Sequence, residues 1–548
     1  MSETGTSIAP WKAVVELVVV PTAAVVLLVN LIWGGRAEPD PRRRIANAIG
    51  CRLYATAARE YRQLLRSDPH DVELHRGYLA SHFALPSRSG RSSTRDDATI
   101  LREYEAWAAT VSDPALADLA HYGLGYAHTL VGDHEGALAH YRRVRNQGLP
   151  YLNNSFGYSL ARVGAVREAE RRFRLEIALG GNVGGATFNL ATLYFAEGRT
   201  ADLRALAAQR GASGFFPQRV VRRLALGDLR LGEYAMAVAG AHRAGALAVA
   251  GAVVLLAGWF LFIRRLDVFE PEPLPYAFAC LVGGMASNLL ATPLYDTLDF
   301  ALGFRLTGQP VHDLAFCVFG IGLVEELVKV IPVLLMIRNT RAVDESVDYF
   351  VYASISALGF AFLENLMYFE DRGLSSIVGR GLTAVVMHMA LTSLAVYGLF
   401  YARYRQRRMA PLWFAASFAA ACAIHGLYDF WLVEQGWVGE LAIVSTLVLV
   451  YAVGSYRNAL QCALNVSENA LDRTISLTVF LCAWIALVFV LEFLVLAGRF
   501  GVVDADLVIA SQGLSSLFLI IVILAVLGTF QVHAGDWVGL LRRARKAA

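Results

Sequence analysis

The stretch Gly322-Leu-Val-Glu-Glu-Leu-Val-Lys-Val-Ile-Pro332 decides the fold, because it places charges inside an apolar segment from Leu314 to Ile337. Such a segment is long enough to cross a bilayer as a helix. A charged side chain at the centre of a membrane helix costs roughly 2.5 to 3.5 kcal/mol. Glu325, Glu326 and Lys329 are therefore expected to face a polar interior between helices. The i, i+4 spacing predicts a pair between Glu325 and Lys329, with Glu326 rotated about 100° away.

Three later apolar segments carry polar side chains of the same kind. Glu364 and Asn365 share one segment, His388 lies in the next, and His425 is followed four residues later by Asp429 in a third. Carboxylates and imidazoles activate water, either directly as bases or as ligands of a metal ion. The sequence therefore predicts one site assembled from four consecutive helices.

The composition places the chain in a membrane. Of its 548 residues, 56% are hydrophobic and 17% are charged, whereas a soluble domain has about 45 to 50% apolar and about 25% charged residues. A multi-pass protein in a lipid bilayer is expected. The net charge of +3 does not indicate a nucleic-acid partner, and none is expected.

The predicted fold class is all-α, with a membrane bundle of about ten spans and a soluble α-solenoid. The expected parts are a signal-anchor helix at 1–36, a repeat domain at 42–243, the membrane core at 245–456, and further membrane helices with a basic tail at 457–548. Within the core and beyond it, spans are expected near 245–263, 276–295, 314–337, 347–369, 379–401, 412–432, 441–456, 474–496 and 507–530.

The repeat domain is predicted from four glycines at a regular spacing. Gly132, Gly164, Gly198 and Gly232 lie 32, 34 and 34 residues apart. The pattern resembles tetratricopeptide repeats, whose period is about 34 residues and whose glycine supplies a positive φ between paired helices. An earlier helix is expected at 52–66 and a flexible insertion at 86–95. Such a solenoid offers a concave groove to a peptide or protein partner; the alternative is a rigid spacer.

The core motifs resemble those of a known family. They are Glu325-Glu326-x-x-Lys329, Phe360-Ala-x-x-Glu364-Asn365-x-x-Tyr368, His388 and His425-Gly-x-x-Asp429, preceded by Asp267-Val-Phe-Glu-Pro-Glu-Pro273. Over about 264–431 the chain resembles the PrsW-type intramembrane proteases, and it is distantly similar to the CAAX-prenyl endopeptidases. The resemblance implies an integral-membrane endopeptidase of the bacterial cytoplasmic membrane. It also implies that the substrate is a membrane protein of the anti-sigma-factor type, cut in regulatory proteolysis.

Two mechanisms remain open for these residues. In one, Glu325 or Glu326 is the general base and Glu364 its partner, while His388 and His425 hold the water or stabilise the oxyanion. In the other, zinc is bound by His388, His425 and Glu364 and lowers the pKa of its water to about 7. Three further residues are expected to have supporting roles. Lys329 would keep a carboxylate ionised, Asn365 would be an additional amide donor, and Asp429 would orient the imidazole of His425.

The orientation follows from the basic residues in short loops. Arginines at 264, 265, 338, 341, 403, 405, 407 and 408, and the tail at 542–546, mark alternate connections as cytoplasmic. The repeat domain is then extracytoplasmic, although the basic run at 42–44 argues the other way. At 1.5 Å per residue, Glu325, Glu364, His388 and His425 lie about 8 to 17 Å below the outer ends of their helices. A site that opens toward the outer face is expected.

Two functions of other classes compete with the protease. A receptor or scaffold would bind partners through its repeats and use the spans only as an anchor. A proton-coupled transporter would also need intramembrane Glu and His residues, but it does not explain why all four lie toward one side of the bilayer.

Overall fold

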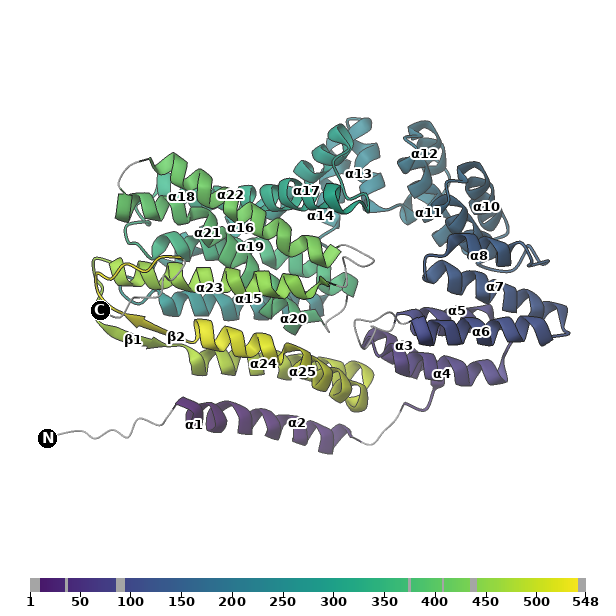
Figure 1. Ribbon diagram of the computed structural model, residues 1–548, viewed down its shortest axis with the longest axis horizontal. Coiled ribbons are helices and arrows are strands. Elements are labelled where there is room, and N and C mark those ends of the chain that lie inside the picture. The colour runs from purple at the N-terminus through teal and green to yellow at the C-terminus, as the bar shows by residue number, and fades with distance from the viewer. Residues whose placement is uncertain are drawn as a thin grey trace. The chain divides into compact units, whose positions relative to one another are not determined.

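The computed structural model describes residues 10–34, 38–84, 94–372, 376–406, 409–433 and 441–540. The chain divides into two compact units, which Figure 1 shows coloured along the sequence. The membrane unit comprises Met1–Gly35, Ala239–Gly498 and Ala505–Ala548, and the repeat unit comprises Arg36–Val238 and Arg499–Asp504. Most of the expected insertion at 86–95, the arginines at 407 and 408, and the basic tail at 542–546 lie outside the described residues.

Nine helices in the described part of the membrane unit are long and apolar enough to cross a membrane. They are the run of α1 (Pro10–Val14), η1 (Val15–Val19) and α2 (Val20–Trp33), then α15 (Ala246–Leu266), α16 (Leu274–Leu302) and α19 (Asp348–Arg372), the run of α20 (Ile377–Leu382), α21 (Ala384–Tyr401) and η5 (Ala402–Gln406), and finally α22 (Ala410–Val433), α23 (Ile443–Val466), α24 (Thr478–Phe500) and α25 (Val502–Leu527). This multi-pass arrangement confirms a membrane protein.

The expected tenth span, at 314–337, differs from the other nine. It is helical but divided into α17 (Pro310–Phe316), the π-helical turn η3 (Cys317–Gly322) and α18 (Leu323–Asn339). The 17 residues of α18 include Glu325, Glu326 and Lys329, so the segment does not meet the length and composition of a lipid-facing span. Its charges are instead paired inside the protein, as described below.

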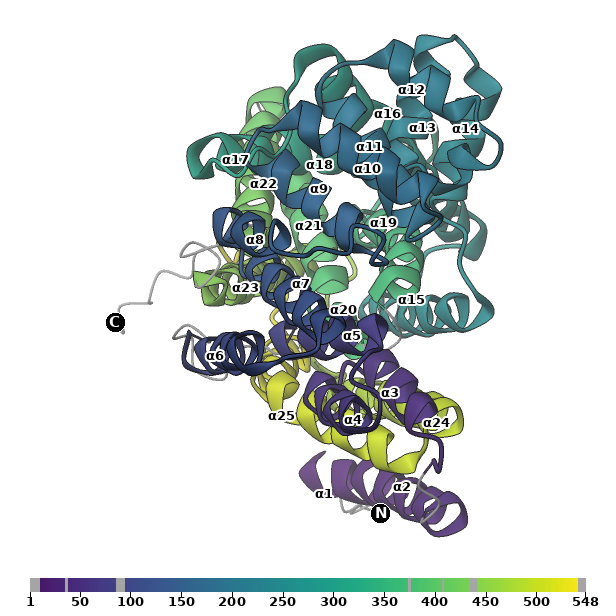
Figure 2. The same cartoon turned by 90° about the vertical axis from the view of Figure 1, so that its right-hand side faces the viewer.

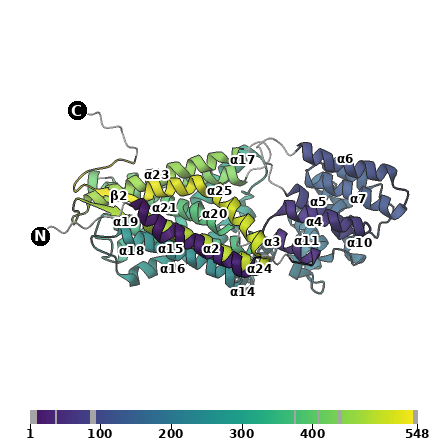
Figure 3. The same cartoon turned by 90° about the horizontal axis from the view of Figure 1, so that it is seen from below.

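Helix α19 lies at the centre of the membrane unit. It packs against α15, α16, α18 and α21 (Figure 1), and most of its length is buried, as is that of the α20–α21–η5 run. A polar side chain on α19 is therefore held by helices on several sides. By contrast, little of the first helix is buried, and Figure 3 shows α1 and α2 in purple along one side of the membrane unit. Asn30 on α2 donates a hydrogen bond to Asp506 of α25 at 3.3 Å.

A pair of short strands departs from the all-α expectation. Strand β1 (Arg473–Ser476) precedes α24 and strand β2 (Thr529–Val532) follows α25, in antiparallel register with Ile475 opposite Phe530. Both of these side chains are buried. The strands therefore take the residues that the sequence assigned to the start of one span and the end of another.

The repeat unit is built from helices that follow one another in chain order (Figures 1 and 2). They are α3 (Pro41–Gly50), α4 (Tyr54–Ser67), α5 (Val72–Phe83), α6 (Thr94–Thr110), α7 (Pro114–Leu130), α8 (His134–Tyr141), α9 (Leu152–Arg162), α10 (Val166–Ala178), α11 (Val183–Ala196), α12 (Thr200–Ala207), the 3₁₀ turn η2 (Ala212–Phe215), α13 (Gln218–Gly227) and α14 (Leu231–Gly240). Helix α4 occupies the place expected for an early helix at 52–66.

The spaced glycines form the turns between paired helices at three of the four expected places. Gly132, Gly164 and Gly198 have φ of 82°, 82° and 67°, and they separate α7 from α8, α9 from α10 and α11 from α12. The fourth prediction was wrong. Gly232 lies inside α14, and the positive φ of the last turn, 54°, belongs to Leu229. An equal spacing thus does not require glycine when another residue accepts the left-handed conformation.

Candidate active site

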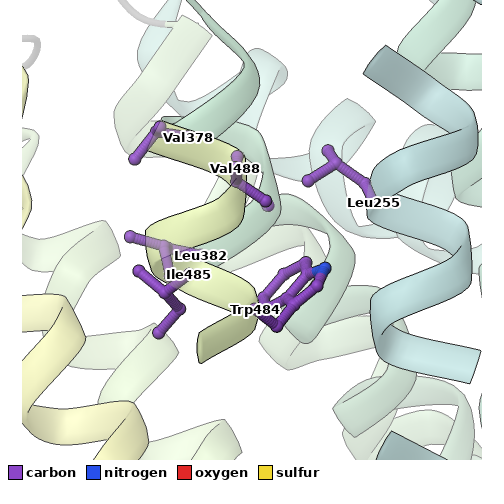
Figure 4. A pocket seen from close by; sticks show the side chains of 7 residues that line it. Leu255, Val378, Leu382, Trp484, Ile485 and Val488 are labelled. Atoms are coloured by element: carbon purple, nitrogen blue, oxygen red, sulfur yellow. The ribbon is translucent and has the colours of Figure 1, made fainter. Parts of the chain in front are cut away.

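A small pocket in the membrane unit carries no reactive chemistry. It lies between α15, α20 and α24 (Figure 4). Its lining consists of Gly381 and six hydrophobic side chains: Leu255, Val378, Leu382, Trp484, Ile485 and Val488. The Trp484 indole N–H is already directed to the carbonyl of Val254, at 3.4 Å. The reactive groups of this unit lie elsewhere, where α18, α19, α21 and α22 meet.

Close backbone packing brings α18 to α22. A Cβ added to Gly322 would lie 2.4 Å from the carbonyl oxygen of Cys422, and one added to Gly426 would lie 2.4 Å from Cα of Val318. Only glycine therefore allows η3 to pass this close to α22. The π-helical turn η3 ends directly before α18, and such turns are frequent at functional sites. The consequence is that Glu325 and Glu326 lie next to His425.

Lys329 is fully buried and joins the two glutamates to His388. Its Nζ donates to Glu326 Oε1 at 2.7 Å and to His388 Nδ1 at 3.0 Å, and it lies 3.4 Å from Glu325 Oε2. The expected pair with Glu325 is present, but the shorter contact is with Glu326, three residues away. A buried ammonium needs such partners, because an unpaired charge is costly there.

The two neighbouring glutamates have different surroundings. Glu326 is fully buried and accepts hydrogen bonds from Lys329, from Thr392 Oγ1 at 2.8 Å and from His425 Nδ1 at 2.8 Å. Glu325 accepts one from the Tyr295 hydroxyl at 2.9 Å on Oε1, and its side chain remains 12% exposed. Three donors occupy Glu326, whereas Oε2 of Glu325 faces both imidazoles.

His388 and Glu364 form the second half of the cluster. His388 Nε2 lies 2.7 Å from Glu364 Oε2. Because a carboxylate only accepts, this contact puts the imidazole hydrogen on Nε2 and leaves Nδ1 as the acceptor for Lys329. Glu364 also pairs with Arg380 Nη2 at 2.9 Å. These contacts fix both the tautomer and the orientation of His388.

His425 has its hydrogen on the opposite nitrogen. Nδ1 donates to Glu326, so the lone pair of Nε2 points toward carboxylate oxygens, 3.4 Å from Asp429 Oδ2 and 3.6 Å from Glu325 Oε2. Asp429 was expected to orient this imidazole, and it is close, but the shorter contact is with Glu326. A lone pair among carboxylates requires a proton or a cation between them.

Asn365 lies beside Arg380. Its Oδ1 accepts a hydrogen bond from Arg380 Nε at 2.5 Å, so the side chain supports the arginine. The guanidinium also lies over the ring of Tyr368, 3.8 Å from the ring centroid. Arg380 thus holds Glu364, Asn365 and Tyr368 on one side of α19.

Sequence reasoning missed three residues that contact the cluster: Tyr295, Arg380 and Thr392. Arg380 had a signal, since it is a basic residue in an apolar stretch eight positions before His388. Tyr295 and Thr392 had none, because tyrosine near a helix end and threonine inside a membrane helix are ordinary residues there.

The cluster fits a divalent metal ion. Glu325, His388 and His425 each offer one ligand atom, and these atoms lie within 4.8 Å of one another. Two imidazoles and a carboxylate form a common zinc set, and each imidazole is held at its other nitrogen by a carboxylate, as metal-bound histidines usually are. Glu364, which the sequence placed among the ligands, contacts the far nitrogen of His388. Lys329 donates to the near nitrogen, so a metal ion and this hydrogen bond exclude each other.

Comparison with known proteins places this geometry in a family. The model of the PrsW family intramembrane metalloproteases matches residues 272–454, which include the whole cluster. The chain is 30% identical over 190 residues to Protease PrsW of Geobacillus kaustophilus (strain HTA426), which covers 34% of this chain and 78% of that protein. The chain belongs to the PrsW family.

Two further relatives carry the same name. Protease PrsW of Clostridioides difficile (strain 630) is 27% identical over 207 residues, 36% of this chain and 84% of that protein. Protease PrsW of Bacillus subtilis (strain 168) is 29% identical over 118 residues, 21% and 54% of the two chains. The protein is therefore an intramembrane protease. The match to the PrsW family extends further toward the C-terminus than the motifs alone had indicated, and the repeat unit lies outside it.

Proposed function

We propose that this protease hydrolyses a peptide bond of a membrane protein at the cluster formed by Glu325, His388 and His425. One observation carries the proposal: Oε2 of Glu325 lies 3.9 Å from His388 Nδ1 and 3.6 Å from His425 Nε2. Each imidazole is held at its other nitrogen by Glu364 or Glu326. A carboxylate and two oriented imidazoles thus converge without having to reorganise during the reaction.

Glu325 is the better candidate for the general base than Glu326. All the contacts of Glu326 go to buried donors, so it serves to hold His425 and Lys329 in place. The Glu325 side chain is partly exposed, and its Oε2 faces the imidazoles. In this role it takes a proton from water and passes it to the leaving amine.

The histidines and Arg380 have supporting parts in this scheme. His388 and His425 position the water. The nitrogens that face Glu325 are acceptors in the tautomers described above, so an imidazole donates to the developing oxyanion only after it has gained a proton. Arg380 keeps Glu364 ionised and directed at His388. Asn365 is the support of Arg380, rather than a donor to substrate.

A metal-dependent scheme uses the same residues differently. A bound divalent ion, zinc by the nature of the donors, would lower the pKa of water and polarise the scissile carbonyl. Glu325, His388 and His425 would hold it, and Glu364 and Glu326 would orient the two imidazoles. Lys329 would turn from His388 toward Glu325 and Glu326, which it already contacts.

The position of the site along its helices indicates the face of the membrane near which the enzyme cuts. Glu364 lies near the end of α19 where Glu370 accepts a hydrogen bond from the N–H of Gly245, at 2.9 Å. Gly245, which directly precedes α15, therefore lies at the same end of the membrane helices as Glu370. The candidate site is closer to this end than to the other. With that side outward, as the basic loops indicate, the enzyme cuts near the outer face of the cytoplasmic membrane. The resemblance to the PrsW-type proteases implies that the substrate is a membrane-anchored regulatory protein of the anti-sigma-factor type.

The repeat unit recruits or positions that substrate in our proposal. In this proposal the unit is a tetratricopeptide-like solenoid, and its paired helices and spaced glycine turns support that interpretation. A hollow of about 470 Å³ lies between α7 and the loops around it, lined by His70, Pro114, Ala115, Asp118, Leu119, Arg145, Asn146 and Leu149. Apolar, charged and amide groups together suit an extended peptide.

The test combines metal analysis with cleavage. The full-length protein is purified in detergent, its metal content is measured, and cleavage of a single-span reporter is followed with and without chelator, with the cut site mapped by mass spectrometry. About one zinc per chain, together with chelator-sensitive cleavage, assigns the metal-dependent scheme. Metal-free cleavage assigns the base role to Glu325. A cut in the half of the reporter span that faces the cytoplasm would contradict the proposed orientation.

A further inference from the structure

A second group of carboxylates lies at the other end of α19, about 24 Å along the helix axis from Glu364 at 1.5 Å per residue. Glu272 comes from the Asp267–Pro273 loop before α16, Asp344 from the loop before α19, and Asp348 from the first residue of α19. Each offers one oxygen, and the three oxygens lie within 4.8 Å of one another. The loop is a sequence motif that the peptidase chemistry does not use.

Two carboxyl groups of this cluster, those of Glu272 and Asp348, are buried, and Asp348 is short of donors. Asp348 Oδ2 accepts the backbone N–H groups of Asp344 and Glu345, at 3.0 and 2.6 Å. Its Oδ1 is buried without a hydrogen-bond partner among the described residues, although the carboxyl group of Glu272 is in contact with Asp348. Glu272 Oε2 accepts a hydrogen bond from Tyr352 at 2.5 Å. Two facing carboxyl groups need a proton or a cation between them.

The charge balance of the neighbourhood favours a cation. Three more acidic side chains surround the converging oxygens: Asp267, Glu270 and Glu345. Of the described ion pairs, one brings a positive charge here, from Arg264 to Asp267 Oδ2 at 3.4 Å. Glu345 Oε2 is also buried without a partner in the described part of the chain. A single shared proton would satisfy one pair of carboxyl groups and leave Glu345 Oε2 buried without a partner among the described residues.

We propose that Glu272, Asp344 and Asp348 bind one hard divalent cation, Mg²⁺ or Ca²⁺, at the end of the bundle opposite the active site. These ions prefer carboxylate oxygens and complete their coordination with water. Asp344 is exposed, so it gives the ion a path to solvent and leaves room for water ligands. The bound ion ties the Asp267–Pro273 loop to the start of α19, the helix that carries Glu364 at its far end.

The test is cation binding to the full-length protein in detergent after removal of metals with EDTA. MgCl₂ and CaCl₂ are titrated separately by calorimetry, and thermal unfolding is recorded with and without each ion. We expect one ion per chain for at least one of the two salts, and an unfolding temperature that rises until this site is saturated. Asp344→Asn, at an exposed position, should weaken binding about tenfold or more.

Three variants make the outcome decisive. Glu270→Gln is the matched control, because it removes an exposed charge from the same loop outside the converging group, and it should leave the affinity within about twofold. Glu325→Gln should also keep this binding, since it alters only the other end of α19. Asp348→Asn should abolish it. The proposal is overturned if neither ion binds, if Asp344→Asn binds as tightly as the control, or if Asp348→Asn raises the unfolding temperature and no ion does, which would show a shared proton.

Discussion

The two ends of α19 solve the problem of buried charge in different ways. Around Glu364, acidic side chains meet Lys329, Arg380 and two histidines at contacts of 2.7 to 2.9 Å. Around Asp348, six acidic side chains share one arginine, and two buried oxygens lack a partner among the described residues. The first arrangement is preorganised and leaves one oxygen, Oε2 of Glu325, directed at the imidazoles. The second becomes balanced only when a cation or protons are added.

The largest effect on stability is expected when a buried charge near Glu364 loses its partner. Lys329→Met leaves Glu326 buried without its ammonium partner, and we expect the free energy of unfolding to fall by about 3 to 5 kcal/mol. The double variant Lys329→Met with Glu326→Gln removes the stranded charge and should recover part of that loss. Thermal unfolding in detergent measures both. Equal destabilisation by the single and the double variant would show that the pair is not coupled.

The close packing of η3 on α22 has a smaller effect. Gly426→Ala puts a Cβ 2.4 Å from Cα of Val318, so α22 must move and take His425 with it. We expect a loss of about 1 to 3 kcal/mol in stability, together with a fall in cleavage. Gly454→Ala on α23 is the control, because nothing lies within 4 Å of the added atom. If both variants behave alike, close helix approach is not what positions His425.

Replacing Arg380 tests whether the ion pair with Glu364 contributes to activity. Arg380→Gln removes the ion pair with Glu364, while Glu364 keeps its contact with His388. Residues that orient a catalytic or metal-binding histidine typically contribute 10- to 100-fold, so we expect the turnover of the reporter to fall by about that factor. The unfolding temperature should also fall, because Glu364 loses its cationic partner, but by less than in Lys329→Met, since Glu364 keeps its contact with His388. Unchanged turnover would mean that Glu364 is held by His388 alone.

The smallest effect concerns ionisable groups outside the membrane. Burial lowers the pKa of His140 in the repeat unit to about 4, and the nearby His128, His121 and Arg143 add to the shift. The folded unit therefore favours neutral His140, whereas the unfolded chain has a pKa of about 6.5. Stability is fully present above about pH 6.5 and is lost as the pH falls toward 4. Hydrogen exchange of α7 and α8 should show weaker protection at pH 5 than at pH 7.5, and His140→Gln should reduce this difference. Equal protection at both values, after correction for intrinsic exchange, would count against it.

Many residues of the site could be predicted from the sequence because polar and charged side chains are unusual in apolar segments. Carboxylates and imidazoles in four apolar segments must avoid lipid, so their convergence was predictable, and Glu325, Glu326, Glu364, His388 and His425 do meet. What spacing cannot provide is the pairing within the cluster. That Lys329 chooses Glu326, and that His425 is held by Glu326 more closely than by Asp429, depends on the π-helical turn and on glycine contacts between helices.

The fold, too, could be predicted from the sequence only in part. The membrane helices were predictable from long apolar runs, and three repeat turns from spaced glycines. The two strands of four residues each could not be predicted, because their sequences do not stand out from the long apolar runs beside them. Leu229, rather than Gly232, carries the last left-handed turn, which the glycine spacing alone does not predict.

We infer that Glu325 is the reactive carboxylate, and cleavage of the reporter by two matched variants tests this role. Glu325→Gln and Glu492→Gln each neutralise a glutamate inside a membrane helix; Glu492 lies in α24, where it accepts a hydrogen bond from Gln512 at 2.8 Å. We predict that Glu325→Gln lowers the cleavage rate by about 10³-fold or more, whether Glu325 is a base or a metal ligand, while Glu492→Gln stays within about twofold of the unaltered enzyme. Cleavage by Glu325→Gln at a rate near that of Glu492→Gln would contradict the account.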